Sequence, residues 1–163
     1  MDTEQPQTTE STPETEPATA VAEAAAPVPA AEPDKAGFFW GTGRRKASVA
    51  RVRIRPGEGK FMVNNREIDA YFTELRDQQD VVAPLKVTST DGKIDVFVNV
   101  KGGGSTGQAG AVLLGLSRAL KRYDVGLELS LRGEGMLSRD PRAVERKKYG
   151  QPGARKRFQF SKR

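Results

Sequence analysis

The sequence contains no cysteine and no histidine among its 163 residues. The missing cysteines exclude disulfides and thiolate metal sites, and the missing histidines remove the commonest general base and metal ligand. No apolar run approaches the roughly 20 residues that span a bilayer, and no signal peptide pattern opens the chain. We therefore expect a soluble, cytoplasmic protein with no metal, no cofactor and no catalytic residues.

Charge is divided unevenly along the chain, although the net charge is +6. Residues 1–37 hold eight acidic residues and one base, a net charge of −7. Residues 38–163 hold 26 basic and 13 acidic residues, a net charge of +13. A basic body of this size most often binds a polyanion, because Lys and Arg that neutralise phosphates release condensed counterions. The alternative is a basic surface that is merely solvated.

The N-terminal segment is built largely of Thr, Glu, Pro and Ala, and its first 36 residues include no aromatic side chain. Such a segment buries too little apolar area to offset chain entropy, so we predict that residues 1–37 are disordered. The acidic segment either screens the basic body before a partner binds or is a solvating tail. We assign residues 38–138 to a globular domain and residues 139–163 to a basic C-terminal extension.

Alternating apolar side chains predict the strands. Residues 50–55 alternate between apolar side chains and arginines, which indicates a half-buried strand with a basic outer face. Turn residues follow at 56–59, so residues 46–64 are predicted to form a hairpin. Residues 94–100 alternate strictly and give the strongest strand signal in the chain. A short strand is also predicted at residues 85–87, followed by a tight turn at Asp91-Gly92.

Apolar side chains spaced three and four residues apart predict the helices. These helices cover residues 68–75, with Asn65 as the cap, residues 78–83, ended by Pro84, and residues 106–123. Residues 125–131 fit either a strand or a continuing helix. Residues 138–141 have the composition of a helix start with Pro at the first helical position.

A glycine-rich stretch, GGGSTG at residues 102–107, satisfies the G-x-G-x-x-G pattern of dinucleotide-binding folds. It follows a predicted strand and opens a predicted helix, and Asp124 lies where such a fold places its ribose-binding acid. We reject this interpretation because Asp124 follows the helix directly instead of ending a second parallel strand. The last 25 residues are also too basic and irregular to supply further βαβ units.

Two interpretations of the glycines remain. Free backbone N–H groups at a glycine-rich helix N-terminus attract phosphate, and a neighbouring lysine adds positive charge. Alternatively, the glycines form a tight turn that needs positive φ angles. Because three consecutive glycines exceed the usual need of a turn, we predict that a nucleic-acid phosphate approaches Lys101, Gly102, Gly103 and Gly104.

Basic residues gather in three clusters. Guanidinium groups bind phosphates in a forked geometry and aromatic rings stack on exposed bases, so arginines interleaved with Phe158 and Phe160 suit RNA. A solvated face explains any single cluster but is a poor explanation for three. The clusters are Arg44, Arg45 and Lys46 with Arg51 and Arg53; Arg139, Arg142, Arg146, Lys147 and Lys148; and Arg155, Lys156, Arg157, Lys162 and Arg163.

Four stretches of the chain together resemble ribosomal protein nine of the small subunit, in its bacterial form, over about residues 40–163. They are GTGRRKASVARVRI, VKGGGSTGQAGAVLLGLSRAL, SRDPRAVERKKYG and the closing FQFSKR. The resemblance implies a two-layer α/β (α+β) domain with a four-stranded mixed sheet and a left-handed βαβ crossover. It also implies that the protein is not an enzyme. The sequence departs from the family at Pro152-Gly153 and at residues 132–136, where family members are usually more basic.

The resemblance further implies a structural constituent of the small ribosomal subunit that supports translation. Its expected partners are rRNA of the subunit head, neighbouring head proteins and the peptidyl-site tRNA, and no small-molecule substrate or membrane is expected. Ser161, Lys162 and Arg163 carry the implied tRNA contact. A generic basic RNA chaperone is the alternative. The residues expected to bind rRNA are the basic ones of the first two clusters apart from Arg53, together with Lys101, Gly102, Gly103, Gly104, Arg155, Lys156 and Arg157.

Overall fold

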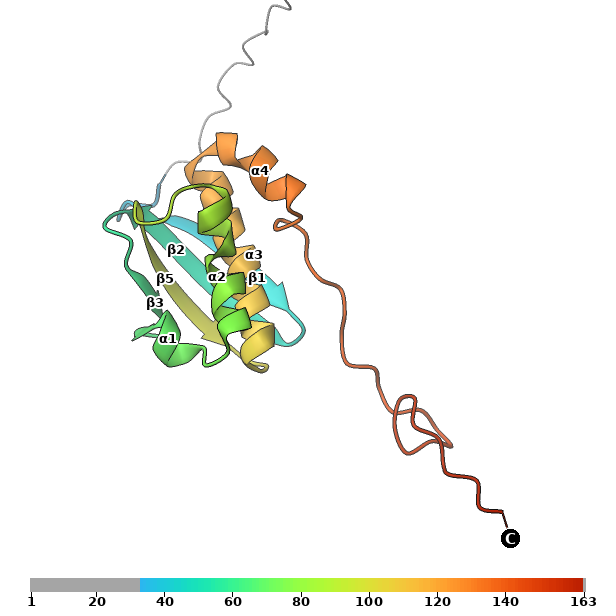
Figure 1. Cartoon of the computed structure of the whole chain (residues 1–163). Coiled ribbons are helices and arrows are strands. Elements are labelled where there is room, and N and C mark those ends of the chain that lie inside the picture. Colours follow the sequence, from blue (N-terminus) through green and yellow to red (C-terminus); the bar gives the residue numbers. More distant parts are fainter. Residues whose placement is uncertain (1–32, 163) are drawn as a thin grey trace, which may run out of the picture.

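The computed structural model describes residues 33–162, and Figure 1 shows one mixed sheet with helices packed on one face. Most of the segment predicted to be disordered, residues 1–32, lies outside the described residues, as does Arg163. The predicted two-layer α+β architecture is confirmed. The sheet has five strands instead of four, because a two-residue strand pairs at one edge.

The strands are ordered β1-β2-β5-β3-β4 across the sheet. β1 and β2 pair antiparallel, as do β2 and β5, whereas β3 runs parallel to β5. The strands are β1 (Phe39–Arg45), β2 (Ser48–Pro56), β3 (Phe61–Val63), β4 (Arg66–Glu67) and β5 (Ile94–Lys101). The helices are α1 (Ile68–Tyr71), α2 (Leu75–Val87), α3 (Ser105–Tyr123) and α4 (Glu128–Gly133), with a 3₁₀ turn at Val125–Leu127.

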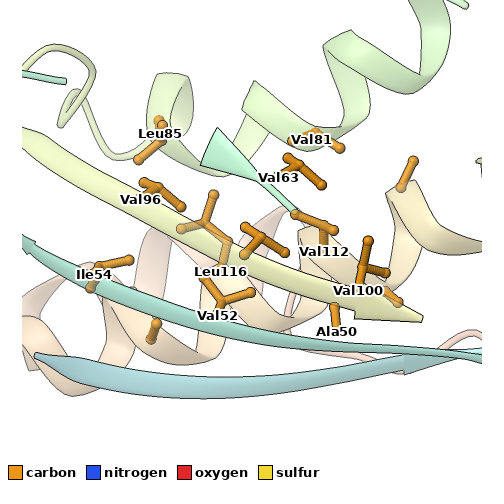
Figure 2. Packing of buried hydrophobic residues seen from close by; sticks show 14 of the residues in the cluster. Ala50, Val52, Ile54, Val63, Val81, Leu85, Val96, Val100, Val112 and Leu116 are labelled. Atoms are coloured by element: carbon orange, nitrogen blue, oxygen red, sulfur yellow. The ribbon is translucent and has the colours of Figure 1, made fainter. Parts of the chain in front are cut away.

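The hydrophobic core lies between the sheet and α2 and α3 (Figure 2). The inward residues of β2 and β5 are buried and alternate with outward residues that are mostly polar or charged. Fully burying one Val, Ile or Leu side chain contributes about 1.5–3 kcal/mol. The core includes Ala50, Val52, Ile54, Val96 and Val98 from the sheet and Val81, Val112, Leu116 and Leu120 from the helices.

The close contact between α3 and the edge strand β1 depends on glycine. A Cβ atom at Gly43 would overlap the carbonyl oxygen of Ala111, and one at Gly41 would overlap that of Gly115. Two arginines of α3 then reach over the strand. Arg118 donates to the Thr42 carbonyl at 2.8 Å and Arg122 to the Trp40 carbonyl at 2.9 Å. β1 is therefore held by backbone packing and by side-chain donors at the exposed edge.

The predicted hairpin at residues 46–64 is wrong. β2 pairs with β1 on one side and with β5 on the other, so β3 has no place beside it. The turn residues that follow β2 carry the chain over the end of β5, where Gly57 donates to the Lys93 carbonyl at 3.0 Å. The true hairpin joins β1 to β2 through Lys46, whose φ is 50°.

The helix between residues 68 and 75 is shorter than predicted, since α1 ends at Tyr71. Asn65 does not cap it, because its φ of 64° places it in a left-handed turn and Glu67 occupies the cap position. Its neighbour Asn64 instead bonds to the Val100 backbone in both directions, at 2.9 and 3.0 Å.

Pro84 does not end the following helix but lies inside α2, which continues to Val87. The strand predicted at residues 85–87 is therefore wrong. Proline removes one helical hydrogen bond, but Pro84 and Leu85 are both buried, so packing keeps this turn helical.

The strand at 94–100, the turn at Asp91-Gly92 and the helix at 106–123 are confirmed, and residues 125–131 are helical. No helix begins at residues 138–141, so that prediction is wrong. β3 and β5 are parallel and connected through α1 and α2, and the hand of this connection stays a prediction.

Candidate RNA interface

The glycine loop between β5 and α3 is largely explained by its backbone. Gly102 and Gly103 have φ angles of 76° and 67°, which favour glycine. A Cβ atom at Gly103 would also overlap the hydroxyl of Ser48, which donates to the Gly102 carbonyl at 2.9 Å. Gly104 differs, because its φ is −106° and the space around its Cα is open. The turn interpretation thus explains Gly102 and Gly103, and Gly104 is the position open to a ligand.

Three of the predicted contact residues share the sheet face that lies opposite the helices. Arg44 pairs with Val49 between β1 and β2, and Val49 pairs with Lys101 between β2 and β5. Arg51 follows Val49 by two residues on β2, so its side chain lies on the same face of the sheet. All three basic side chains are exposed. Arg51 and Lys101 line a pocket together with Val49 and Asn99. The structure therefore brings Arg44, Arg51 and Lys101 together into one basic surface.

Arg45 points to the other side of the sheet, toward α3 and the C-terminal extension. It donates to the Thr106 carbonyl and to Asp140 Oδ2, each at 3.2 Å. The pKa of Asp140 is lowered by the bond from the Arg142 backbone N–H and by the Arg45 guanidinium. Arg45 is thus on the other side of the sheet from Arg51, lines a pocket together with Arg44 and Asp140, and holds the beginning of the extension. Lys46 is exposed in the turn between β1 and β2.

The C-terminal extension leaves the domain after Leu137, and residues 139–162 contain no helix or strand (Figure 1). Glu145 and Arg155 close a loop within it, with Arg155 Nε 3.1 Å from Glu145 Oε2. This pair lowers the pKa of Glu145 and raises that of Arg155. The predicted residues that are exposed in the extension are Arg139, Arg142, Arg146, Lys147, Lys148, Arg155, Lys156, Arg157, Ser161 and Lys162.

Comparison with known proteins shows which family the chain belongs to. A model of the family described as ribosomal protein S9/S16 matches residues 43–163. The chain belongs to this family. The resemblance drawn from the sequence is confirmed, and so is the expectation that the protein is not an enzyme, because relatives in this S9/S16 family are structural proteins of the ribosome.

Relatives of this S9/S16 member are similar over most of its length. It is 56% identical to small ribosomal subunit protein uS9 of Treponema pallidum over 123 residues, which are 76% of this chain and 95% of that protein. It is 54% identical to uS9 of Anaeromyxobacter sp. over 121 residues, or 74% and 93% of the two chains. It is 53% identical over 130 residues to small ribosomal subunit protein uS9m of Arabidopsis thaliana; these are 80% of this chain but only 30% of that longer protein.

Sequence reasoning missed one group of side chains on the outer sheet face. The rings of Phe38, Trp40 and Phe97 lie against the guanidinium groups of Arg53 and its neighbours, at 5.1–6.0 Å from ring centroid to Cζ. The alternation of residues 50–55 placed the arginines on this face. Phe97 comes from β5, Trp40 from β1 and Phe38 from the residue before β1, and the strand pairing that brings them together was not predicted.

Across residues 33–162, no helix is long and apolar enough to cross a membrane. The same residues contain no group of three or more acidic side chains placed to hold a metal ion.

Proposed function

We propose that this S9/S16 family member is a structural constituent of the small ribosomal subunit that supports translation. It binds rRNA in the subunit head beside neighbouring head proteins, and its C-terminal extension reaches the tRNA in the peptidyl site. The observation that carries the proposal is the extension itself. Its described residues, 139–162, are largely exposed and contain no helix or strand, and the sequence of residues 139–163 carries a net charge of +8.

The globular domain contributes a fixed basic surface to this binding. Arg44, Arg51 and Lys101 contact rRNA phosphates, and a phosphate reaches the open backbone at Gly104, at the N-terminus of α3. Because phosphate contacts position a protein but carry no sequence information, most of these contacts are independent of sequence. Arg45 supports the interface indirectly, by holding the extension against the domain.

The extension contacts RNA that lies beyond the globular domain. Its basic residues between Arg139 and Arg157 thread between rRNA helices, while Ser161, Lys162 and Arg163 contact the tRNA backbone. Ordering such a segment costs conformational entropy, which the phosphate contacts must offset. The exposed Glu145–Arg155 pair is worth little in water, so RNA is the partner that fixes the path of this segment.

Co-sedimentation tests the proposal directly. A tagged chain expressed in cells should appear once per small subunit after sedimentation in high salt. A generic RNA chaperone would instead bind many RNAs and wash off the purified subunits, and that result would contradict the proposal. Replacing Arg51 and Lys101 together by Ala should reduce incorporation into subunits, because both cations contact phosphate. Replacing the exposed Arg76 and Lys86 of α2 is the matched control.

A further inference from the structure

The outer face of the sheet carries arginines and aromatic rings in register. Trp40 on β1 pairs with Arg53 on β2, and Arg53 in turn pairs with Phe97 on β5. Phe38 precedes β1 and packs edge-on against Phe97, with 6.1 Å between ring centroids. We call the set of Phe38, Trp40, Arg51, Arg53, Arg55 and Phe97 the arginine–aromatic face. Among residues 33–162, the helices pack only against the opposite side of the sheet (Figure 1).

The rings hold the guanidinium groups in place. Arg53 Cζ lies 5.1 Å from the ring centroid of Phe38, 5.4 Å from that of Phe97 and 6.0 Å from that of Trp40. Arg51 lies 5.6 Å from the Trp40 ring. Contacts of this kind are favourable by about 0.5–1 kcal/mol at exposed sites. The guanidinium planes are therefore oriented before any partner binds.

The positive charge of this face is only partly balanced. Arg55 bonds to Asp95 at 3.3 Å, but within residues 33–162 neither Arg51 nor Arg53 forms an ion pair. Asp34 accepts a hydrogen bond from the Trp40 indole N–H at 3.3 Å, which engages the edge of that ring and not its face. Arginines two residues apart on one strand repel each other, so an anionic partner would relieve this repulsion.

We propose that the arginine–aromatic face binds a single-stranded segment of RNA, with a phosphate on Arg51 and an unpaired base stacked beside Trp40 and Arg53. The proposal rests on the RNA-binding function proposed above and adds a site to it. Unpaired bases stack on aromatic rings and on guanidinium planes, and phosphates bind the guanidinium edges. An acidic protein segment would need the charge but not the oriented flat groups, so the geometry favours RNA.

The only tryptophan of the chain lies in this face, which gives a direct readout. A single-stranded RNA of about 12 nucleotides, a length within the usual site sizes for such surfaces, should quench the fluorescence of Trp40 in the full-length protein. A duplex of the same length should quench it less, because its bases are already paired and stacked. Quenching by an oligoglutamate as strong as that by RNA would overturn the proposal.

A conservative pair of variants separates stacking from charge. Arg53→Lys keeps the charge but loses the flat guanidinium, so it should weaken single-strand binding roughly tenfold, within the range for one stacked base. The salt dependence should not change, since the number of neutralised phosphates is the same. Arg76→Lys makes the same substitution on the exposed side of α2 and should bind like the unaltered protein.

The outcomes also distinguish this site from the function on which it rests. If the unaltered protein binds the single strand in a filter assay without any change in Trp40 emission, the face is not the site and the ribosomal function stands. Equal affinities for Arg53→Lys and Arg76→Lys would reject the site in the same way. If Trp40 is quenched but the protein is absent from purified small subunits, the proposed function fails and the site remains.

Discussion

Arg45 and Asp140 join the first strand to the beginning of the C-terminal extension by an ion pair of 3.2 Å. Their side chains are 26% and 30% exposed, so solvent screens this pair less than a fully exposed one. Arg45 also bonds to the Thr106 carbonyl, which adds the first turn of α3 to the contact. These contacts tie the beginning of the extension to the domain at one point.

Asp140→Ala should release the beginning of the extension. The variant loses the acceptor for Arg45 and for the Arg142 backbone N–H. Hydrogen exchange of residues 136–142 should accelerate several-fold, while the global free energy of unfolding should change little, because this partly exposed pair contributes little to the stability of the domain. Glu145→Ala, which removes the exposed pair with Arg155, is the control and should leave this segment unchanged. Unaltered exchange in Asp140→Ala would show that the pair does not fix the extension.

The sequence predicted those features that depend on local pattern. The alternation in β5 and the apolar spacing in α3 each bury one face, so both elements were predicted nearly to the residue. The partner of β2 depends instead on long-range pairing. Turn residues after Pro56 suggest a hairpin whether or not β5 lies beside β2, and only the complete sheet excludes β3 from that place.

The candidate site was likewise predicted only where local sequence pattern is sufficient. Strand alternation in the sequence placed Arg51 on the exposed face, whereas Lys101 was selected because it precedes the glycine loop, and only the strand register brings the two onto one face. It did not separate Arg45 from Arg44, although adjacent strand residues point to opposite faces. Arg45 was grouped by charge with its neighbours, and its partner Asp140 lies 95 residues away. The rings beside Arg53 were missed because they belong to other strands.

Gly43→Ala should destabilise the domain, because the added methyl group meets the Ala111 carbonyl across the β1–α3 contact. Overpacking against backbone that cannot move costs about 1–3 kcal/mol or more. Gly133→Ala is the matched control, since nothing lies within 4 Å of the added atom. Thermal unfolding of the two variants measures the difference. Equal melting temperatures would mean that α3 and β1 are not in backbone contact.

Gly103→Ala and Gly104→Ala separate the two interpretations of the glycine loop. Gly103→Ala should lower stability, because its φ is positive and the methyl group meets Ser48. Gly104→Ala has neither problem, and although Gly is a better N-cap than Ala, it should lose much less stability than Gly103→Ala. If a phosphate approaches this backbone closely, Gly104→Ala should weaken incorporation into small subunits. Normal incorporation would leave the loop with a folding role alone.

Asp95→Asn should reduce stability by about 1–2 kcal/mol at neutral pH. The buried carboxylate accepts bonds from the Lys60 and Glu58 backbone N–H groups at 3.1 and 3.0 Å and from Arg55. These donors, led by Lys60, lower the pKa of Asp95.

The contribution of Asp95 is thus fully present above its ordinary pKa of about 4 and is lost as the pH falls through the lower folded value. Urea unfolding at a series of pH values should show the difference between the two proteins shrinking only in that acidic range. A difference that stays constant down to the lowest pH at which the domain folds would contradict this.

Deleting Ser161–Arg163 should leave assembly intact but weaken tRNA binding at the peptidyl site. Ser161 and Lys162 are exposed and lie well beyond the folded domain, so their loss removes no packing. Losing two cations at a phosphate contact should lower tRNA affinity roughly tenfold, measured by filter binding to purified subunits. Replacing Lys147 and Lys148 by Ala removes the same charge from the middle of the extension and should spare tRNA binding. If both variants weaken tRNA binding equally, the effect is one of total charge and the terminal residues have no special role.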